Sequence, residues 1–310
     1  MKKLMLLSCL AAGLMTACAS GGKSPQTDAP HFLIGFQLYS VRTDLEKDFY
    51  GTLKKVREMG YDGVEFYNEF YGHSPVEVKA ICTELGLIPF SNHVPFQTMI
   101  DDLDQVIRDN TILGVQYIAF PYMDGPSRPA NNPERFKETA ARIAQIGAEV
   151  RKAGIQLLYH NHDFEFAKLP DGTVGHDYLF ANSAPEDLQV ELDVCWSDYA
   201  GFPPAELITR YAGRIPVIHL KDYFKEGDMG GDPYSLIGVS KEEAAKSGRG
   251  TFEYRPVGTG LVDIPAVIAA SAASGVRWIC VEQDEPRAGA KDRFEGPAES
   301  AQYLKANGLL

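Results

Sequence analysis

The sequence lacks any concentration of positive charge. Its 310 residues include 30 Lys and Arg against 42 Asp and Glu, a formal net charge of −12, and no long run of basic residues occurs. Binding to nucleic-acid phosphates requires clustered Lys and Arg. With 45% hydrophobic and 23% charged residues, the composition is otherwise that of a globular protein. The sequence therefore argues against a nucleic-acid partner and against general disorder.

Closely spaced cysteine pairs are also absent from the sequence. No Cys-x-x-Cys spacing occurs among the 5 cysteines, so neither a zinc knuckle nor a disulfide framework is indicated. Cys82, Cys195 and Cys280 lie in apolar segments. We expect buried, unreactive thiols at these three positions.

The chain contains no apolar run of the ~20 residues that a membrane-spanning helix needs, but it begins with a shorter one. Residues 1–17 combine a basic start, an apolar stretch and small residues, the pattern of a secretory signal peptide. Residues 15–18 (Met-Thr-Ala-Cys) resemble the lipobox of bacterial lipoproteins. This implies an exported protein, cleaved before Cys18 and anchored to a bacterial membrane by lipid on that thiol; a plain signal peptide is the alternative. Residues 18–30 would then form a flexible tether.

One unit is repeated along residues 31–310. In most copies a helical pattern ends at a glycine, a short apolar strand follows, and a polar residue closes the strand. Glycine is expected just past a helix end because the backbone φ there is positive. The copies with this glycine are 60–65, 86–93, 114–122, 154–162, 213–219 and 275–282, and two strands without it are 32–37 and 188–193.

Helical patterns connect these strands. Apolar and small side chains recur at helical spacing in the segments 99–113, 136–150, 262–274 and 292–305. Strands that alternate with helices form parallel sheets with right-handed crossovers. Eight such units in about 280 residues predict a (β/α)8 TIM barrel as one domain. A doubly wound open sheet is the alternative fold.

The polar strand ends form the candidate active site. A (β/α)8 barrel carries its active site at the carboxyl ends of the strands, and four of the 7 His residues occur there. Because the strand interiors are mainly Ile, Leu, Val and Phe, we do not expect the polar ends to belong to the core. These residues are Gln37, Glu65, His93, His160, His162, Asp193, His219 and Glu282.

Two segments interrupt the repeat. Residues 223–257 follow the seventh strand and contain many glycines among charged residues. We expect a lid or a binding loop there, with a disordered insertion as the alternative. Residues 164–175 follow the fifth strand, and Pro170-Asp171-Gly172 within them predicts a hairpin turn.

The ends of strands five to eight contain a mixed set of metal ligands. Divalent cations such as Mn²⁺ or Mg²⁺ are held by carboxylates with few imidazoles. Asp193, His219 and Glu282 end successive strands, and Glu165 follows the fifth. Each also has a purely structural interpretation: a helix cap, a buried histidine or half of an ion pair. Their joint occurrence predicts a site for one divalent metal ion.

Segments between residues 33 and 285 resemble the sugar isomerase/epimerase-like TIM barrels, a family whose folds are similar to xylose isomerase and endonuclease IV. The family includes ketose epimerases, aldose–ketose isomerases, inosose dehydratases and lyases of keto-glycosides, so the resemblance implies the fold more specifically than the reaction. The matching segments are Gln37–Arg42, Tyr61–Glu65, Tyr159–Phe166, Leu192–Asp193, His219–Asp222, Pro256–Gly260 and Val281–Glu282.

In the ketose epimerases of this family, a Glu-Asp-His-Glu set binds Mn²⁺ and the two Glu residues also move protons. The resemblance therefore implies Mn²⁺ as the ion, with Mg²⁺, Zn²⁺, Co²⁺ or Fe²⁺ as alternatives. The segment 160–162 (His-Asn-His) is richer in imidazole than the epimerase pattern. Carried over by position, the ligands would be Glu165, Asp193, His219 and Glu282, with His162 as the alternative to Glu165.

Such a site acidifies the C–H beside a substrate carbonyl, and a carboxylate removes the proton. Returning that proton to the other face gives epimerisation, returning it to the neighbouring carbon gives isomerisation, and loss of a β-substituent gives elimination. The predicted acid–base pair is Glu165 and Glu282, with Lys221 and His93 polarising the substrate oxygen or assisting a leaving group. The residues predicted to bind the sugar are Gln37, Glu65, His160 and Trp196.

The sequence has no P-loop or similar glycine-rich phosphate cradle, and sugar phosphates are scarce outside the cytoplasm. The expected substrate is therefore a neutral sugar or a keto-sugar. The expected activity is that of an isomerase or epimerase, with a lyase or hydratase acting on 3-keto-glycosides as the alternative. A lipid-anchored sugar-binding protein without catalysis is the candidate from another class. Homo-oligomerisation is left open.

Overall fold

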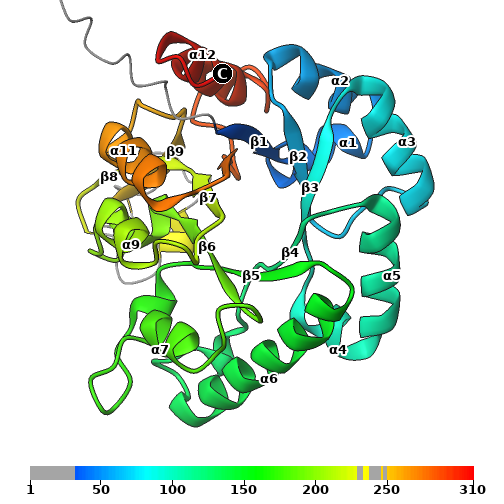
Figure 1. Ribbon diagram of the computed structural model, residues 1–310. Coiled ribbons are helices and arrows are strands. Elements are labelled where there is room, and N and C mark those ends of the chain that lie inside the picture. The colour runs from blue at the N-terminus through cyan, green and yellow to red at the C-terminus, as the bar shows by residue number, and fades with distance from the viewer. Residues whose placement is uncertain (1–31, 229–232, 237–245, 247–249) are drawn as a thin grey trace, which may run out of the picture.

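Eight parallel strands close into a barrel, as the repeated unit predicts (Figure 1). The structure is a computed structural model that describes residues 32–228, 233–236, 246 and 250–310. Around the barrel the strand order is β1-β10-β7-β6-β5-β4-β3-β2. Because β1 pairs with β10, with Ile34 opposite Ile279, the sheet is closed and the open-sheet alternative is excluded. The strands are β1 Leu33–Gln37, β2 Gly63–Phe66, β3 Ile88–His93, β4 Tyr117–Phe120, β5 Gln156–His160, β6 Gln189–Asp193, β7 Val217–Leu220 and β10 Trp278–Val281.

Helices surround this barrel (Figure 1). The segment 99–113 divides into two helices, because the Asp102 carboxylate caps the second one by accepting a hydrogen bond from the Gln105 amide (3.0 Å). Gly60 and Gly114 end their helices with φ of 110° and 87°, as the sequence predicts. The helices are α1 Arg42–Leu45, α2 Phe49–Met59, α3 Pro75–Leu85, α4 Phe96–Asp101, α5 Leu103–Leu113, α6 Pro133–Lys152, α7 Gly175–Ala181, α8 Val194–Tyr199, α9 Pro204–Arg210, α11 Ile264–Ser274 and α12 Glu295–Ala306. Short 3₁₀ helices are η1 Leu38–Val41, η2 Gly125–Ser127, η3 Phe164–Phe166 and η4 Pro233–Leu236.

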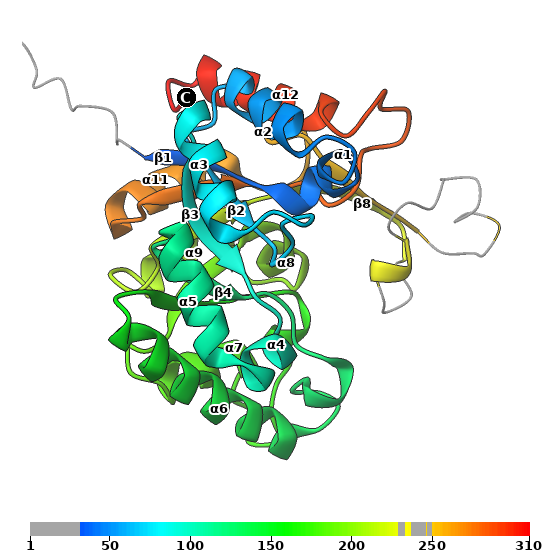
Figure 2. The same cartoon turned by 90° about the vertical axis from the view of Figure 1, so that its right-hand side faces the viewer.

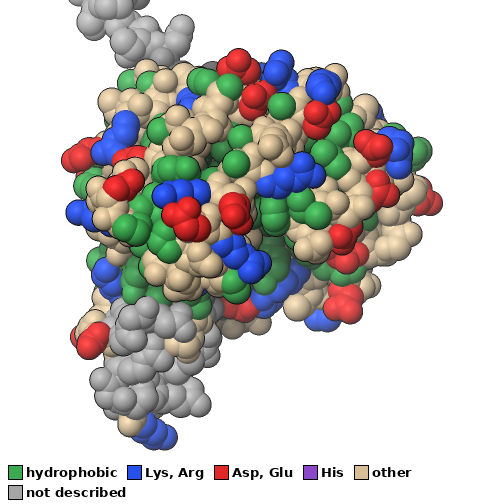
Figure 3. Space-filling model, turned by 90° about the horizontal axis from the view of Figure 1, so that it is seen from below, with side chains coloured by type: hydrophobic (Ala, Val, Ile, Leu, Met, Phe, Trp, Pro, Cys, Tyr) green, Lys and Arg blue, Asp and Glu red, His purple; other side chains and the backbone are tan. Residues whose placement is uncertain are grey.

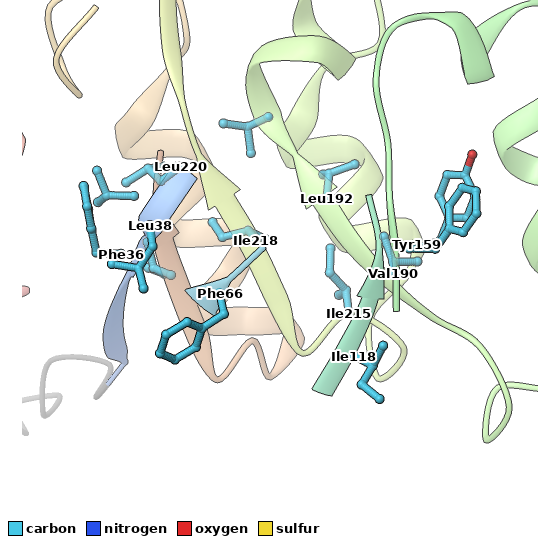
Figure 4. Close-up of a cluster of buried hydrophobic side chains, with 14 of the residues drawn as sticks. Phe36, Leu38, Phe66, Ile118, Tyr159, Val190, Leu192, Ile215, Ile218 and Leu220 are labelled. Atoms are coloured by element: carbon cyan, nitrogen blue, oxygen red, sulfur yellow. The ribbon is translucent and has the colours of Figure 1, made fainter. Parts of the chain in front are cut away.

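Two apolar cores follow from the alternation of side chains along each strand. Alternate residues point into the barrel, where Phe90 stacks on Trp278 with ring centroids 4.1 Å apart. The intervening residues point outward and pack beneath the helices (Figure 4). The apolar residues of this inward-facing core include Tyr117, Leu158, Val217 and Cys280. Cys82, Cys195 and Cys280 are buried free thiols, as expected.

The segment that follows β7 contains two strands that the sequence analysis missed. Strands β8 (Asp222–Glu226) and β9 (Thr251–Arg255) pair in an antiparallel ribbon beside the barrel (Figure 2). The segment 223–257 was expected to form a lid or a binding loop, and the sequence analysis placed no strands within it. Phe252 and Tyr254 alternate with polar residues along β9, and Tyr223 of β8 stacks on Phe252 with ring centroids 5.5 Å apart. Between the two strands, only Pro233–Leu236, Lys246 and the residues flanking each strand are described.

The hairpin turn predicted after β5 is confirmed: the Gly172 amide donates a hydrogen bond to the Leu169 carbonyl (2.9 Å), and Lys168 forms a β-bridge with Val174.

On the face of the molecule seen from below, acidic and basic side chains are interspersed (Figure 3). In the described part of the chain, no helix has the length and apolar character required to cross a bilayer. The predicted signal peptide (1–17), Cys18 and the tether (18–30) lie outside the described residues.

Candidate active site

A pocket of about 410 Å³ is lined by polar residues from the strand ends and by aromatic side chains. Its floor is polar, and its residues lie at or just beyond the ends of four strands: His93, His160, Lys221 and Glu282. Its wall is largely aromatic: Tyr39, Tyr67, Tyr122, Trp196, Tyr234 and Tyr254. An apolar rim around polar groups is typical of a small-molecule site.

We call the four donors nearest this floor the outer layer: His160, Asp193, His219 and Glu282. Their potential ligand atoms all lie within 4.8 Å of one another. Asp193 ends β6 and caps α8, because its Oδ1 accepts hydrogen bonds from the amides of Cys195 (2.9 Å) and Trp196 (3.1 Å). Its Oδ2 is left facing His160 Nε2 at 3.7 Å. The start of a helix therefore fixes the orientation of this carboxylate.

The ammonium group of Lys221 lies among carboxylates of the same region. Its Nζ is 2.7 Å from Glu282 Oε2, 3.0 Å from Asp193 Oδ2 and 3.2 Å from Asp284 Oδ2. Burial alone would lower the pKa of Lys221, but these carboxylates raise it well above the usual range. Conversely, despite its burial, Lys221 and His219 hold the pKa of Glu282 well below the usual range. The lysine is therefore a fixed positive charge on the pocket floor.

Beneath the outer layer lies a second group, which we call the inner layer: Glu65, His93, Glu191 and the Nε2 side of His219. His219 Nε2 is 2.6 Å from Glu65 Oε2, and His93 Nε2 is 2.7 Å from Glu191 Oε2. Gln37 donates from Nε2 to the same Glu65 oxygen (2.8 Å). Burial and the nearby Glu65 raise the pKa of Glu191 to about 7. The two layers share His219, whose Nδ1 lies 2.8 Å from Glu282 Oε2 in the outer layer.

The outer layer fits a divalent metal ion. It combines two carboxylates with two imidazoles, a donor set that first-row divalent ions accept. Burial and the neighbouring His219 and His93 lower the pKa of His160 well below the usual value, so its imidazole is neutral, as a ligand must be. The Glu65 carboxylate beside the far nitrogen of His219 is the arrangement that orients metal-bound histidines.

The structure does not bring Glu165 into this group, contrary to the prediction. Among the described residues, the group that contains Asp193 and Glu282 includes His160 from β5 instead. The Glu165 carboxylate accepts from the Tyr159 hydroxyl (2.8 Å) and from the His162 amide (2.8 Å). Tyr159 belongs to the outward-facing core (Figure 4). Glu165 follows β5 in η3, and its hydrogen bond to the outward-pointing Tyr159 holds it behind the barrel wall, whereas His160 of the same strand points inward.

His162, the alternative ligand, is also outside the outer layer, although it lines the pocket. Its ring is stacked with Phe164 (5.4 Å) and Trp196 (5.8 Å), and Tyr122 packs edge-on against it (4.9 Å). Its Nδ1 is buried without a hydrogen-bond partner in the described part of the protein. Burial and the positive Lys221 lower its pKa well below the usual value. His162 therefore presents a neutral imidazole within an aromatic cage.

The other predicted residues divide into two groups. His93, His160, Lys221 and Glu282 lie on the pocket floor, and Trp196 is in its wall. Gln37 and Glu65, which were predicted to bind substrate, are fully buried and hydrogen-bonded to each other instead of lining the pocket. Their position below the pocket follows from the register of β1 and β2, in which Gln37 pairs with Glu65.

Sequence reasoning missed several residues of this region. Glu191 was treated as a strand interior, yet it precedes Asp193 by two residues and so points to the same side of β6. Asp284 lies two residues after Glu282, beyond the end of β10, and contacts Lys221. Arg42 also lines the pocket, where its Nη1 donates to the Asp284 carbonyl (2.8 Å). A search for polar residues two positions from a strand end finds Glu191 and Asp284; the sequence holds no comparable signal for Arg42.

Comparison with known proteins gives consistent matches. The family model described as xylose isomerase-like TIM barrel matches residues 53–307. An inosose dehydratase of Lacticaseibacillus casei is 26% identical over 180 residues, which cover 58% of this chain and 57% of that relative. The chain thus spans little more than half the length of this curated relative.

Two solved structures are similar in fold. A sugar phosphate isomerase/epimerase of Parabacteroides distasonis superimposes with a TM-score of 0.67 at 21% identity, covering 94% of this chain and 98% of the other. The 3-keto-D-glucoside 4-epimerase of E. coli gives a TM-score of 0.60 at 14% identity, covering 89% of this chain and 99% of the other. At these identities the likeness concerns the fold alone.

Proposed function

Because the chain belongs to the xylose isomerase-like TIM barrel family, we propose that it is a metal-dependent enzyme that removes a proton next to a carbonyl of an unphosphorylated sugar or keto-sugar. The observation that carries this proposal is the outer layer of four converging donors at the base of an aromatic-walled pocket. The first candidate outcome is epimerisation or isomerisation. The second is elimination, which the similarity to an inosose dehydratase favours.

His160, Asp193, His219 and Glu282 would hold the metal ion, with Mn²⁺ as the first candidate. A divalent ion bound there supplies Lewis-acid polarisation of a substrate carbonyl. The protein's own groups complete the site. Lys221 Nζ, fixed on the floor, donates a hydrogen bond to the oxygen that becomes negatively charged when the C–H bond breaks. The aromatic wall packs against the sugar ring and excludes water.

His162 is the proposed general base. Its neutral imidazole lines the pocket, beside the position of the substrate, and a neutral imidazole can accept a proton. It replaces Glu165, whose two carboxylate oxygens already accept hydrogen bonds away from the pocket. Glu282 is the second candidate acid–base group, because it reaches the pocket floor. Return of the proton from either group gives the epimer or isomer, whereas loss of a β-substituent gives the elimination product.

The test is solvent exchange in D₂O, followed by NMR, with unphosphorylated ketoses and 3-keto-glycosides in the presence of Mn²⁺, which is removed before the spectra are recorded. We expect deuterium to enter at the carbon beside the carbonyl with the wild-type protein and with Glu165→Gln, and not with Asp193→Asn. Product analysis then separates an epimer or isomer from a released aglycone or water. Binding of sugars without any exchange would contradict the proposal and favour a sugar-binding protein.

Export and lipid anchoring are a separate part of the proposal. They rest on the signal-like residues 1–17 and the lipobox-like sequence that ends at Cys18. Expression in a bacterial host with radiolabelled palmitate tests them. We expect label in the membrane-associated wild-type protein and none in Cys18→Ser, while label in neither would leave a plain signal peptide as the better interpretation.

A further inference from the structure

The inner layer forms a nearly closed ring of potential metal ligands deep inside the barrel. Successive distances around the ring are 2.7 Å from His93 Nε2 to Glu191 Oε2, 3.4 Å from Glu191 Oε2 to His219 Nε2, 2.6 Å from His219 Nε2 to Glu65 Oε2, and 3.2 Å from Glu65 Oε2 to His93 Nε2. The four side chains come from β3, β6, β7 and β2. All of them are buried, and the two glutamates are fully buried.

Each glutamate of the ring contributes its Oε2 atom, and its second carboxylate oxygen lacks a partner. Glu65 Oε1 and Glu191 Oε1 are buried and accept no hydrogen bond from any described residue. A buried carboxylate oxygen without a donor is costly in free energy, and native proteins nearly always supply a proton donor, water or cation to such an atom. The ring is therefore incomplete as a hydrogen-bond network, which distinguishes it from an ordinary buried ion pair.

From these observations we propose a second divalent-cation site, beneath the pocket, formed by Glu65, His93, Glu191 and Nε2 of His219. Four donors about 2.0–2.1 Å from a tetrahedral ion lie about 3.3 Å from one another. The ring edges of 3.2 and 3.4 Å already match this spacing, and the edges of 2.6 and 2.7 Å would have to open by about 0.6–0.7 Å. Two carboxylates balance the charge of a divalent ion. Two imidazoles with two carboxylates suit Zn²⁺ or a similar first-row ion.

The second site shares His219 with the outer layer and also touches His160, whose Nδ1 lies 3.2 Å from Glu191 Oε2. Glu65, His93 and Glu191 are not members of the group that contains Asp193 and Glu282. The imidazole of His219 connects the two, with Nδ1 directed to Glu282 and Nε2 to Glu65. When both sites are filled, His219 loses both ring protons and bridges the two ions. Filling the inner site thus adds a positive charge directly behind an outer ligand.

The experiment is a metal titration of the whole protein, freed of metal by a chelator. Zn²⁺ alone is added, bound zinc is counted by mass spectrometry after desalting, and Co²⁺ absorption spectra report coordination. We expect two equivalents of Zn²⁺ in the wild-type protein and one in Glu191→Gln. Asp193→Asn should also keep one, at the inner site. The matched control is Glu165→Gln, a buried carboxylate outside both layers, which should keep two.

One equivalent in the wild-type protein that survives Glu191→Gln would overturn the inner site. If Glu191→Gln does not fold, the wild-type Co²⁺ titration decides: two successive spectral components support the proposal, and saturation at one component overturns it. The result is independent of the proposed reaction. Two bound ions without solvent exchange would contradict the proposed reaction and support the inner site. Solvent exchange with only one bound ion would support the proposed reaction and contradict the inner site.

Discussion

The barrel wall at the end of β5 has buried ionisable side chains on both faces, and the two faces behave differently. On the inner face, His160 meets carboxylates from β6 and reaches the pocket floor. On the outer face, Glu165 is fully buried against Tyr159. Burial shifts the pKa of both groups, lowering that of His160 and raising that of Glu165 to about 8. Burial and a shifted pKa therefore do not identify a catalytic group; donors that converge from several strands below an opening do.

The outer-face residue still has a connection to the pocket. Glu165 accepts a hydrogen bond from the His162 amide, and the His162 ring lines the pocket. Its carboxylate thus holds the backbone of the proposed base from behind the wall. We interpret Glu165 as a positioning residue, in contrast to the outer layer, which would hold the metal ion of the proposed function.

The largest effect is expected from Asp193→Asn, which removes charge from the inner face. Loss of one carboxylate ligand should abolish tight metal binding at the outer layer and lower kcat/KM about 10³-fold, because several kcal/mol of charge stabilisation depend on the ion. Metal analysis and steady-state kinetics measure this. The matched control is Asp198→Asn, whose carboxylate holds the Tyr223 hydroxyl (2.9 Å); equal losses in both variants would contradict a ligand role for Asp193.

Lys221→Met should separate catalysis from metal binding. Removing the ammonium group takes a hydrogen-bond donor from the developing oxyanion, so we expect kcat to fall about 10²-fold. The same change removes a competing cation from Asp193 and Glu282, so the outer metal should bind more tightly. Kinetics and a metal titration measure the two effects separately. Weaker metal binding in this variant would show that the lysine supports the ligands instead of competing for them.

His162→Gln tests the proposed base. We expect a loss of about 10²-fold in kcat, with metal content unchanged because His162 lies outside the outer layer. The imidazole must be neutral to act, and its pKa lies well below the usual value. The wild-type rate should therefore persist as the pH falls through about 6.5 and decline only below it. A pH profile of kcat checks this, and a decline centred near 6.5 would assign the role to another group.

Glu165→Gln should have the smallest effect on activity, within a few fold, with metal content unchanged. The substitution should instead change the pH dependence of the free energy of unfolding, because burial raises the pKa of Glu165 from 4.5 to about 8. The folded state holds this proton more tightly than the unfolded state, so the stabilisation is present below about pH 4.5 and is lost as the pH rises through 8. Urea unfolding of both proteins at pH 5, 6.5 and 8 measures the difference. We expect the wild-type protein to lose more stability than Glu165→Gln over this range.

The strand ends show how much of the site the sequence can predict. The repeated unit located all eight barrel strands, and the residues that close β6, β7 and β10 do converge. Near the end of β5 the sequence analysis chose Glu165 or His162 as the metal ligand and assigned His160 to substrate binding, because the order of these residues along the chain does not say which side of the barrel wall each one faces. Glu191 is a similar case. The register of β6 decides whether this glutamate faces the helices or the barrel interior with its potential metal ligands, and the sequence does not reveal that register.

The sequence by itself determined the barrel, its active end and most of the outer layer. Those features depend on local periodicity, on glycines at helix ends and on the rule that parallel strands share one carboxyl edge. Only the tertiary structure decided that Lys221 lies among three carboxylates and that Glu65 meets His219, two residues 154 positions apart in the chain. Such contacts depend on barrel closure and on the register of each strand pair, which set the distances between side chains from distant segments.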